Sequence, residues 1–200
     1  MIFFEVKKVE SRVLEPVSLS IEAGACLGLS GPSGSGKTLL LRQLVDLDPR
    51  KGEVLLKGRS IDSVPAHVWR KSVALLPAES QWWRDTVGEH FSAFNKKRLM
   101  ALGFDASVMK WQISRLSSGE KQRLALLRVL ENNARVLLLD EPTANLDVKF
   151  VSRVEQLLLD YKAARKAALM WVSHDLHQLQ RVADFIYEIR NNRLREVVYG

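Results

Sequence analysis

The feature that most constrains the fold is a glycine-rich stretch, GPSGSGKT, which follows a short apolar run and precedes an amphipathic helical pattern. It fits the pattern G-x-x-x-x-G-K-[ST], in which glycines let backbone N–H groups surround phosphate oxygens at a helix N-terminus. A strand, this loop and a helix predict the phosphate-binding unit of an α/β protein. The residues expected to bind the phosphates of ATP are Gly31, Pro32, Ser33, Gly34, Ser35, Gly36, Lys37 and Thr38.

A carboxylate pair, Asp140 and Glu141, directly follows the apolar run 136–139. Such a pair at the end of a strand could merely cap the next helix. Together with the glycine-rich loop, it predicts the second half of a hydrolytic site. We expect Thr38 and Asp140 to bind Mg²⁺, and Glu141 to orient or deprotonate the attacking water. ATP and Mg²⁺ are therefore the expected cofactors.

Apolar periodicity predicts alternating strands and helices over most of the chain. We expect a P-loop NTPase core with a mostly parallel sheet flanked by helices, N-terminal antiparallel strands and a small inserted helical lobe. Residues 85–131 show helical periodicity throughout. A single domain is expected over residues 1–200, with a RecA-like core at about 1–78 and 132–200 and a helical subdomain at about 79–131. Strands are expected at residues 3–6 and 17–21, both as edge strands, and at 26–30, 53–57, 73–76, 135–139, 168–173, 185–189 and 194–198.

Composition narrows the cellular setting. The longest strictly apolar run, residues 167–172, has six residues, against roughly 18 needed to span a membrane. The single cysteine, Cys26, lies in an apolar run and is expected to be buried. The net charge is +7, but the basic residues are scattered, and the densest group is only Lys96, Lys97 and Arg98. We therefore expect a cytoplasmic protein whose charges are mostly solvated, and consider nucleic-acid binding unlikely.

Two further stretches carry a resemblance to a known family. Residues 116–120, LSSGE, resemble the LSGGQ signature of ABC ATPases, and His174 resembles the switch histidine of that family. The motif order also agrees, with residues 144–147 in the place of the D-loop. The resemblance implies the ATP-hydrolysing subunit of an ABC transporter, with Glu141 and His174 as catalytic residues. It also implies that Ser117, Gly119 and Asp147 contact ATP across a dimer.

The same resemblance implies the partners. Two cassettes, as a homodimer or a paired half-site, would close on ATP and drive a transmembrane permease encoded as a separate chain. The protein would then lie peripherally at the inner face of the cell membrane. A cytosolic ABC ATPase acting on DNA or the ribosome, and a degenerate regulatory cassette, stay open as alternatives.

The sequence departs from the family pattern at three places. Ala78 stands where the family has a glutamine that contacts Mg²⁺, and neither Glu79 nor Gln81 is in register to replace it. Ser118 replaces the first glycine of the signature, where it crowds the backbone or caps the helix. No aromatic residue for stacking on adenine occurs at positions 9–13.

Adjacent tryptophans, Trp82 and Trp83, follow Ala78, and one of them is expected to be buried while the other contacts the permease.

Overall fold

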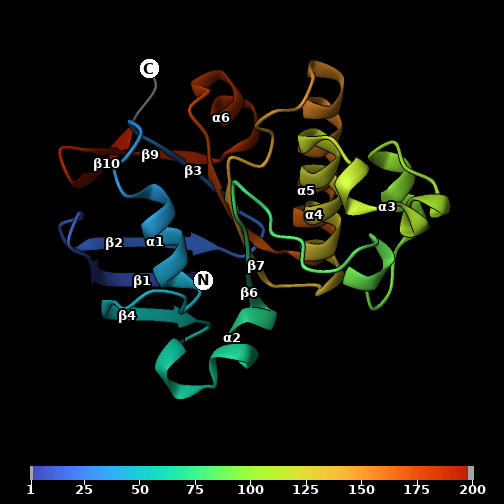
Figure 1. Cartoon of the computed structure of the whole chain (residues 1–200). Coiled ribbons are helices and arrows are strands. Elements are labelled where there is room, and N and C mark those ends of the chain that lie inside the picture. Colours follow the sequence, from blue (N-terminus) through green and yellow to red (C-terminus); the bar gives the residue numbers. More distant parts are fainter. Residues whose placement is uncertain (1, 198–200) are drawn as a thin grey trace.

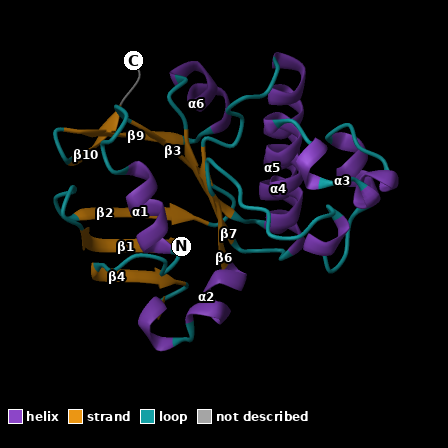
Figure 2. Cartoon of the chain, in the orientation of Figure 1, coloured by secondary structure: helices purple, strands orange, loops and turns teal. Residues whose placement is uncertain are grey.

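The structure is a computed structural model that describes residues 2–197. Its strands form two sheets, and helices pack on the larger one (Figures 1 and 2). No helix within the described range is long and apolar enough to cross a membrane. The strands are β1 (Ile2–Glu10), β2 (Val17–Glu22), β3 (Cys26–Ser30), β4 (Lys51–Leu56), β5 (Arg59–Ser60), β6 (Val73–Leu76), β7 (Val136–Asp140), β8 (Ala168–Val172), β9 (Phe185–Arg190) and β10 (Arg193–Val197).

The larger sheet has the order β10-β9-β3-β8-β7-β6, and all its pairings are parallel except that of β9 with β10. Every residue of β3, β7 and β8 is buried, as expected for parallel strands covered on both faces. This confirms the predicted mostly parallel sheet. Asn191 and Asn192 both have positive φ in the turn between β9 and β10. The last residue of the strand predicted at 194–198 lies outside the described residues.

The smaller sheet is antiparallel and has the order β2-β1-β4-β5. It confirms the predicted N-terminal antiparallel strands, but the prediction of residues 3–6 as an edge strand was wrong. The strand β1 lies between β2 and β4 and extends to Glu10. The sequence does not indicate this extension, because the polar pair Lys7 and Lys8 interrupts the apolar alternation of the strand. Register shifts occur at this point in both of its pairings.

The stretch between β6 and β7 is less regular than its periodicity predicted. Its α-helices are α3 (Lys96–Ala101) and α4 (Ser118–Glu131), and the remainder consists of loops and single 3-10 turns. The described chain has no strand here, only an isolated bridge between Thr86 and Gln112. These turns are η2 (Gly88–His90), η3 (Ala106–Lys110) and η4 (Ile113–Arg115). The lobe projects on the side of the larger sheet away from the smaller one (Figure 1).

The helices outside this stretch are α1 (Lys37–Leu44), α2 (Ala66–Ser72), α5 (Val148–Arg165) and α6 (Leu176–Val182), and a 3-10 turn, η1, covers Ile61–Ser63. The larger sheet separates two apolar clusters, because alternate residues of a strand face opposite sides. Leu137 and Leu139 of β7 pack with residues of α4, α5 and α6. Val136 and Leu138 pack with residues of α1 and of the smaller sheet. Cys26 is buried in the first cluster, as predicted.

Gly28 of β3 permits the close approach of α6 to the larger sheet. A Cβ at this position would lie 3.1 Å from Cβ of Ala183, the residue after α6, and 3.4 Å from Cδ2 of Leu179 within α6. We expect Gly28→Val to lower the free energy of unfolding by about 1–3 kcal/mol, the usual cost of overpacking a core. Urea denaturation measures this change. Ser20→Val on the exposed side of β2 is the control and should change it by less than about 0.5 kcal/mol; equal losses would contradict the packing.

Candidate active site

The glycine-rich loop turns from the end of β3 into α1, and its glycines have backbone angles that other residues rarely adopt. Gly31 and Gly36 have φ of 143° and 99°. A Cβ on Gly31 would lie 2.6 Å from the carbonyl oxygen of Ile189, and one on Gly36 would lie 2.9 Å from Cγ of Leu14. Both glycines are therefore required by conformation and by space. The loop continues directly into the first turn of α1. The free backbone N–H groups at a helix N-terminus stabilise a bound anion.

Lys37 is the first residue of α1 and its side chain folds back over the loop. Its Nζ donates hydrogen bonds to the carbonyl oxygens of Gly31, at 2.7 Å, and Pro32, at 2.9 Å. Burial lowers the pKa of Lys37, and the nearby carboxylates of Glu141 and Asp140 oppose this shift. The ammonium group is thus held in the hollow of the loop, close to two carboxylates.

Thr38 and Asp140 join the loop to the end of β7. The Thr38 hydroxyl donates to Oδ2 of Asp140 at 2.7 Å, although the two residues are 102 positions apart in the chain. Asp140 is buried at 3% exposure, and β7 lies between β6 and β8 in the larger sheet. Two oxygen ligands suited to a hard divalent cation therefore meet beside the loop.

Glu141 follows Asp140 in a left-handed conformation, with φ of 49°. Its N–H donates to the carbonyl oxygen of Val172 at 3.2 Å, which fixes the residue against the end of β8. Burial raises the pKa of the Glu141 carboxyl, and the neighbouring His174 opposes this shift. His174 Nε2 lies 3.3 Å from Oε1 of Glu141, and the histidine side chain is the more exposed of the two. The pair therefore has one half-buried member, Glu141, and one exposed member, His174.

These residues line one open pocket of about 470 Å³, which we call the catalytic pocket. The structure brings together most of the residues that the sequence predicted to bind ATP or to act in catalysis. Gly31 and Pro32, the first two residues of the loop, are not in the lining, and their carbonyl oxygens accept hydrogen bonds from Lys37. The predicted residues in the lining are Ser33, Gly34, Ser35, Gly36, Lys37, Thr38, Asp140, Glu141 and His174.

Three further predicted site residues are also absent from the lining and form a second group of their own. Ser117 caps α4 through a reciprocal capping box with Glu120, and a Cβ on Gly119 would lie 3.1 Å from the carbonyl oxygen of Asn145. Asp147 caps α5 by accepting from the N–H of Phe150 at 3.1 Å. The suggestion that Ser118 caps α4 was wrong, because Ser117 occupies that position and Ser118 is the first helical residue.

Arg123 holds this second group together, and the motifs alone did not reveal it. It is buried at 8% exposure, with its guanidinium carbon 3.5 Å from the ring centre of Phe150 and 4.6 Å from that of Phe104. Its Nη1 donates to the carbonyl oxygen of Leu102 at 2.6 Å. A cation between two aromatic rings packs the helix of the signature against the first turn of α5. The only sequence signal is an arginine four residues after Gly119.

Sequence reasoning also missed residues that line the catalytic pocket. Val13 lies in its lining, so an exposed aliphatic side chain occupies part of the region where the sequence offered no aromatic. Arg42 and Asp48 also line the pocket and form a two-point ion pair at 2.6 and 2.9 Å. Ala78 is in the lining as well, whereas Glu79 and Gln81 are not.

Comparison with known proteins agrees with this geometry. The family model described as "ABC transporter" matches residues 14–144. The Arabidopsis thaliana protein "ABC transporter I family member 17" is 35% identical over 94% of this chain and 76% of its own length. The tungstate uptake system ATP-binding protein TupC of Peptoclostridium acidaminophilum is 31% identical over 93% of this chain and 91% of its own length.

A solved structure shares the fold. A dimeric ATP-binding cassette in a post-hydrolysis state, bound to ADP and phosphate, superposes with a TM-score of 0.84. It is 22% identical in sequence and covers 98% of this chain and 99% of its own. The family match and the two relatives show more than the shared fold, because the family model matches residues 14–144 and the relatives align with 94% and 93% of the chain. The chain therefore belongs to the ABC transporter family, as an ATP-binding cassette whose ATPase activity powers transport.

Proposed function

We propose that the chain binds MgATP in the catalytic pocket, pairs head to tail with a second cassette, and drives a permease encoded as a separate chain. The observation that carries the proposal is the separation of two groups of residues. Lys37, Asp140 and Glu141 line the pocket, whereas Ser117 and Gly119 lie outside it in the same chain. A second cassette would supply the missing signature. We further propose that the cassette divides into a RecA-like core at about residues 1–78 and 132–200 and a helical subdomain at about 79–131.

The roles follow from position and chemistry. The loop amides and Lys37 bind the phosphates, and Thr38 and Asp140 hold Mg²⁺. The fit rests on two oxygen ligands already 2.7 Å apart, because Mg²⁺ is usually bound by one or two protein oxygens together with substrate phosphates and water. When bound, the ion would neutralise phosphate charge. Glu141 would accept a proton from the attacking water, with His174 orienting its carboxylate and reaching the terminal phosphate.

The second group of residues is built to approach the pocket of a partner cassette. Ser117 and Gly119 stand at the N-terminus of α4, where backbone N–H groups and the helix dipole stabilise an anion. Asp147 caps α5, and a Cβ on Gly119 would lie 3.1 Å from the carbonyl oxygen of Asn145 in the loop that leads to this cap. Arg123 fixes the two helix starts relative to each other, so that they would meet a bound terminal phosphate as one unit.

The first prediction concerns the general base. Glu141→Gln should keep ATP binding but lower turnover by roughly 10²–10⁴, the usual range for loss of such a group. With hydrolysis blocked, the variant should elute as an ATP-bound dimer on gel filtration. Wild-type turnover would refute the role of Glu141. Lys37→Ala is the matched control, because it should lose ATP binding itself, which an equilibrium binding measurement detects.

The second prediction concerns Ala78. If its small side chain leaves out a contact to Mg²⁺ or water, Ala78→Gln should raise ATP turnover of the assembled transporter severalfold. Ala78→Leu adds similar bulk without an oxygen and should not raise it. Phosphate release by the reconstituted transporter measures both. An unchanged or lower rate for Ala78→Gln would mean that the catalytic pocket is built around alanine.

The two tryptophans give the third prediction. Trp82 is half-buried against the apolar cluster beneath the lobe, whereas Trp83 is 67% exposed. Arg128 stacks on both rings, at 4.6 and 5.0 Å from their centres. Arg128 therefore holds the two rings in place, and Trp83 is the ring of the pair that a partner protein can reach. We therefore assign Trp82 to the core and Trp83 to the permease contact.

Trp82→Ala should lower the free energy of unfolding by roughly 3 kcal/mol, as a large-to-small core change does. Trp83→Ala should keep the melting temperature and basal ATPase rate but weaken permease binding by about 2 kcal/mol. Thermal melting and pull-down with the membrane subunit distinguish the two variants. The assignment fails if Trp83→Ala binds the permease as wild type does.

A further inference from the structure

A second pocket, of about 770 Å³, lies at the amino ends of the parallel strands, away from the catalytic pocket. Four basic side chains line it: Lys57, Arg135, Arg165 and Lys166. They come from three separate parts of the fold, namely the turn after β4, the residue before β7 and the end of α5. We call it the basic pocket. No carboxylate of the described residues contributes to its lining.

The charges of the basic pocket are not neutralised locally. Among residues 2–197, no ion pair involves any of the four cations. Arg165 donates a hydrogen bond to the carbonyl oxygen of Asn133, at 3.3 Å, and its guanidinium carbon lies 5.9 Å from the ring centre of Tyr161. Of the acidic residues on the neighbouring strands, Glu5 contacts Lys7 at 3.4 Å, and neither Glu5 nor Glu22 lines the pocket. The basic pocket is therefore lined by four positively charged side chains, none of which forms an ion pair with a described carboxylate.

Two of these lysines occupy backbone positions that favour other residues. Lys57 and Gly58 have φ of 52° and 76° in the two-residue turn between β4 and β5, where Asn-Gly is preferred. Lys166 has φ of 50° and ends α5, where glycine or asparagine is usual. A lysine at either place is therefore less favourable for the backbone than the common choice. The backbone conformation alone therefore does not require a cation at either position.

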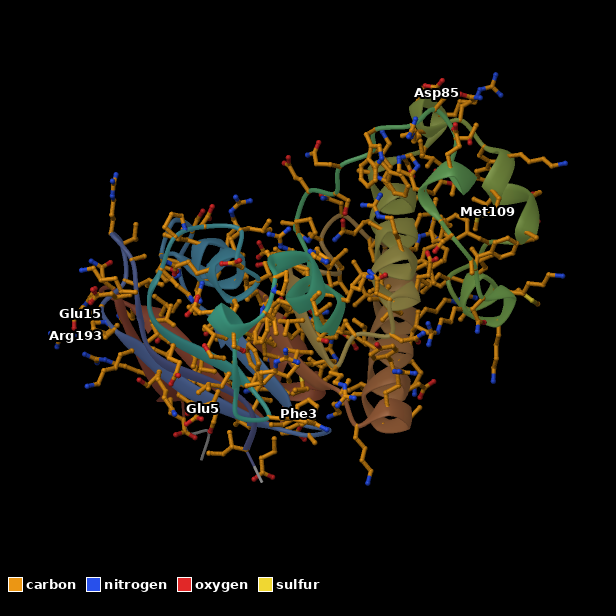
Figure 3. The ribbon with its side chains drawn as sticks, turned by 90° about the horizontal axis from the view of Figure 1, so that it is seen from below. Phe3, Glu5, Glu15, Asp85, Met109 and Arg193 are labelled. Atoms are coloured by element: carbon orange, nitrogen blue, oxygen red, sulfur yellow. The ribbon has the colours of Figure 1, made fainter. Side chains whose placement is uncertain are left out.

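An apolar wall stands beside the four cations. Ile2 is 50% exposed, and Phe3 is half-buried, with Nζ of Lys57 lying 5.1 Å from the centre of its ring. Figure 3 shows Phe3 near Glu5 at the margin of the molecule, far from Asp85 and Met109 of the lobe. Ligand pockets commonly combine an apolar wall with a few convergent polar groups. The wall gives room for the organic part of a ligand.

We propose that the basic pocket binds a phosphate-bearing ligand through Lys57, Arg135, Arg165 and Lys166, with its organic part against Ile2 and Phe3. The planar guanidinium groups of Arg135 and Arg165 suit two-point contacts with phosphate oxygens, and the lysine ammonium groups add point charges. Phosphate of this kind occurs in soluble metabolites and in lipid headgroups, and the experiment below distinguishes them.

The two pockets can be filled at the same time. Arg135 directly precedes β7, and Asp140 is its last residue. Five residue steps at about 3.3 Å each place them roughly 16 Å apart along the strand. A ligand in the basic pocket therefore leaves the catalytic pocket free for nucleotide, and this site is independent of the roles proposed there.

The test uses the full chain with ADP at a concentration that fills the catalytic pocket. Titration calorimetry with inorganic pyrophosphate should show a further binding event, and Arg135→Ala with Arg165→Ala should weaken it at least tenfold. Lys96→Ala with Lys97→Ala in the lobe removes the same charge elsewhere and should leave the affinity within about twofold, since screened surface charges act weakly at a distance. Equal losses in the two double variants would overturn the proposal.

A second pair of substitutions keeps the test valid if the arginine variant does not fold. Lys57→Asn with Lys166→Gly places favoured residues at two positive-φ positions, so its melting temperature should stay the same or rise. Pyrophosphate binding should nevertheless weaken at least tenfold. Stability and binding then change in different directions, which a purely structural role for these lysines does not allow. Undiminished binding would overturn the proposal.

Vesicles identify the source of the phosphate. If the ligand is a lipid headgroup, phosphatidylglycerol vesicles should co-sediment with the protein, phosphatidylcholine vesicles should not, and pyrophosphate should compete. If it is a soluble metabolite, pyrophosphate should bind without any vesicle association. Both results depend on the same four cations. Binding of neither pyrophosphate nor phosphatidylglycerol to the wild-type chain would overturn the proposal.

Discussion

The parallel pairing of β8 between β3 and β7 is the interaction on which the catalytic pocket depends. It brings the carboxyl ends of strands that are far apart in sequence to one edge of the sheet. The hydrogen bond between Thr38 and Asp140 spans 102 positions and is possible only because β8 fixes this register. Glu141 is held by the same strand through the carbonyl oxygen of Val172. A shift of one residue would reverse the faces of the strand and separate these groups.

The second group of site residues, at the starts of α4 and α5, is positioned by side-chain packing and not by the larger sheet. Ser117, Gly119 and Asp147 do not lie at the carboxyl ends of these strands, so the sheet does not position them directly. Arg123 positions them instead. It packs between Phe104 and Phe150 and so connects the lobe to the first turn of α5. The signature is therefore positioned through one buried cation, whereas the catalytic pocket is positioned by backbone pairing.

The sequence predicted the fold class and the loop, because both depend on local patterns. The run 26–30 with its glycine-rich loop gave β3 and the start of α1 without error, since short buried strands and positive-φ glycines have clear signals. The position of β1 between two strands was missed, because partner choice depends on distant residues. The lobe was less helical than its periodicity indicated, since 3-10 turns share that spacing. The contacts of Arg123 required the folded chain.

The two pockets differ in electrostatics as well as in position. In the catalytic pocket Lys37 lies close to Asp140 and Glu141, and Arg42 and Asp48 also line it, so charges of both signs are present before any ligand enters. A polyphosphate bound there is repelled by the carboxylates, and a divalent cation between them would offset this repulsion. In the basic pocket four cations line one space without a carboxylate among the described lining residues, so an anion alone would neutralise them. The net charge of +7 is therefore unevenly distributed, with only cations among the charged residues of the basic pocket and both signs in the catalytic pocket.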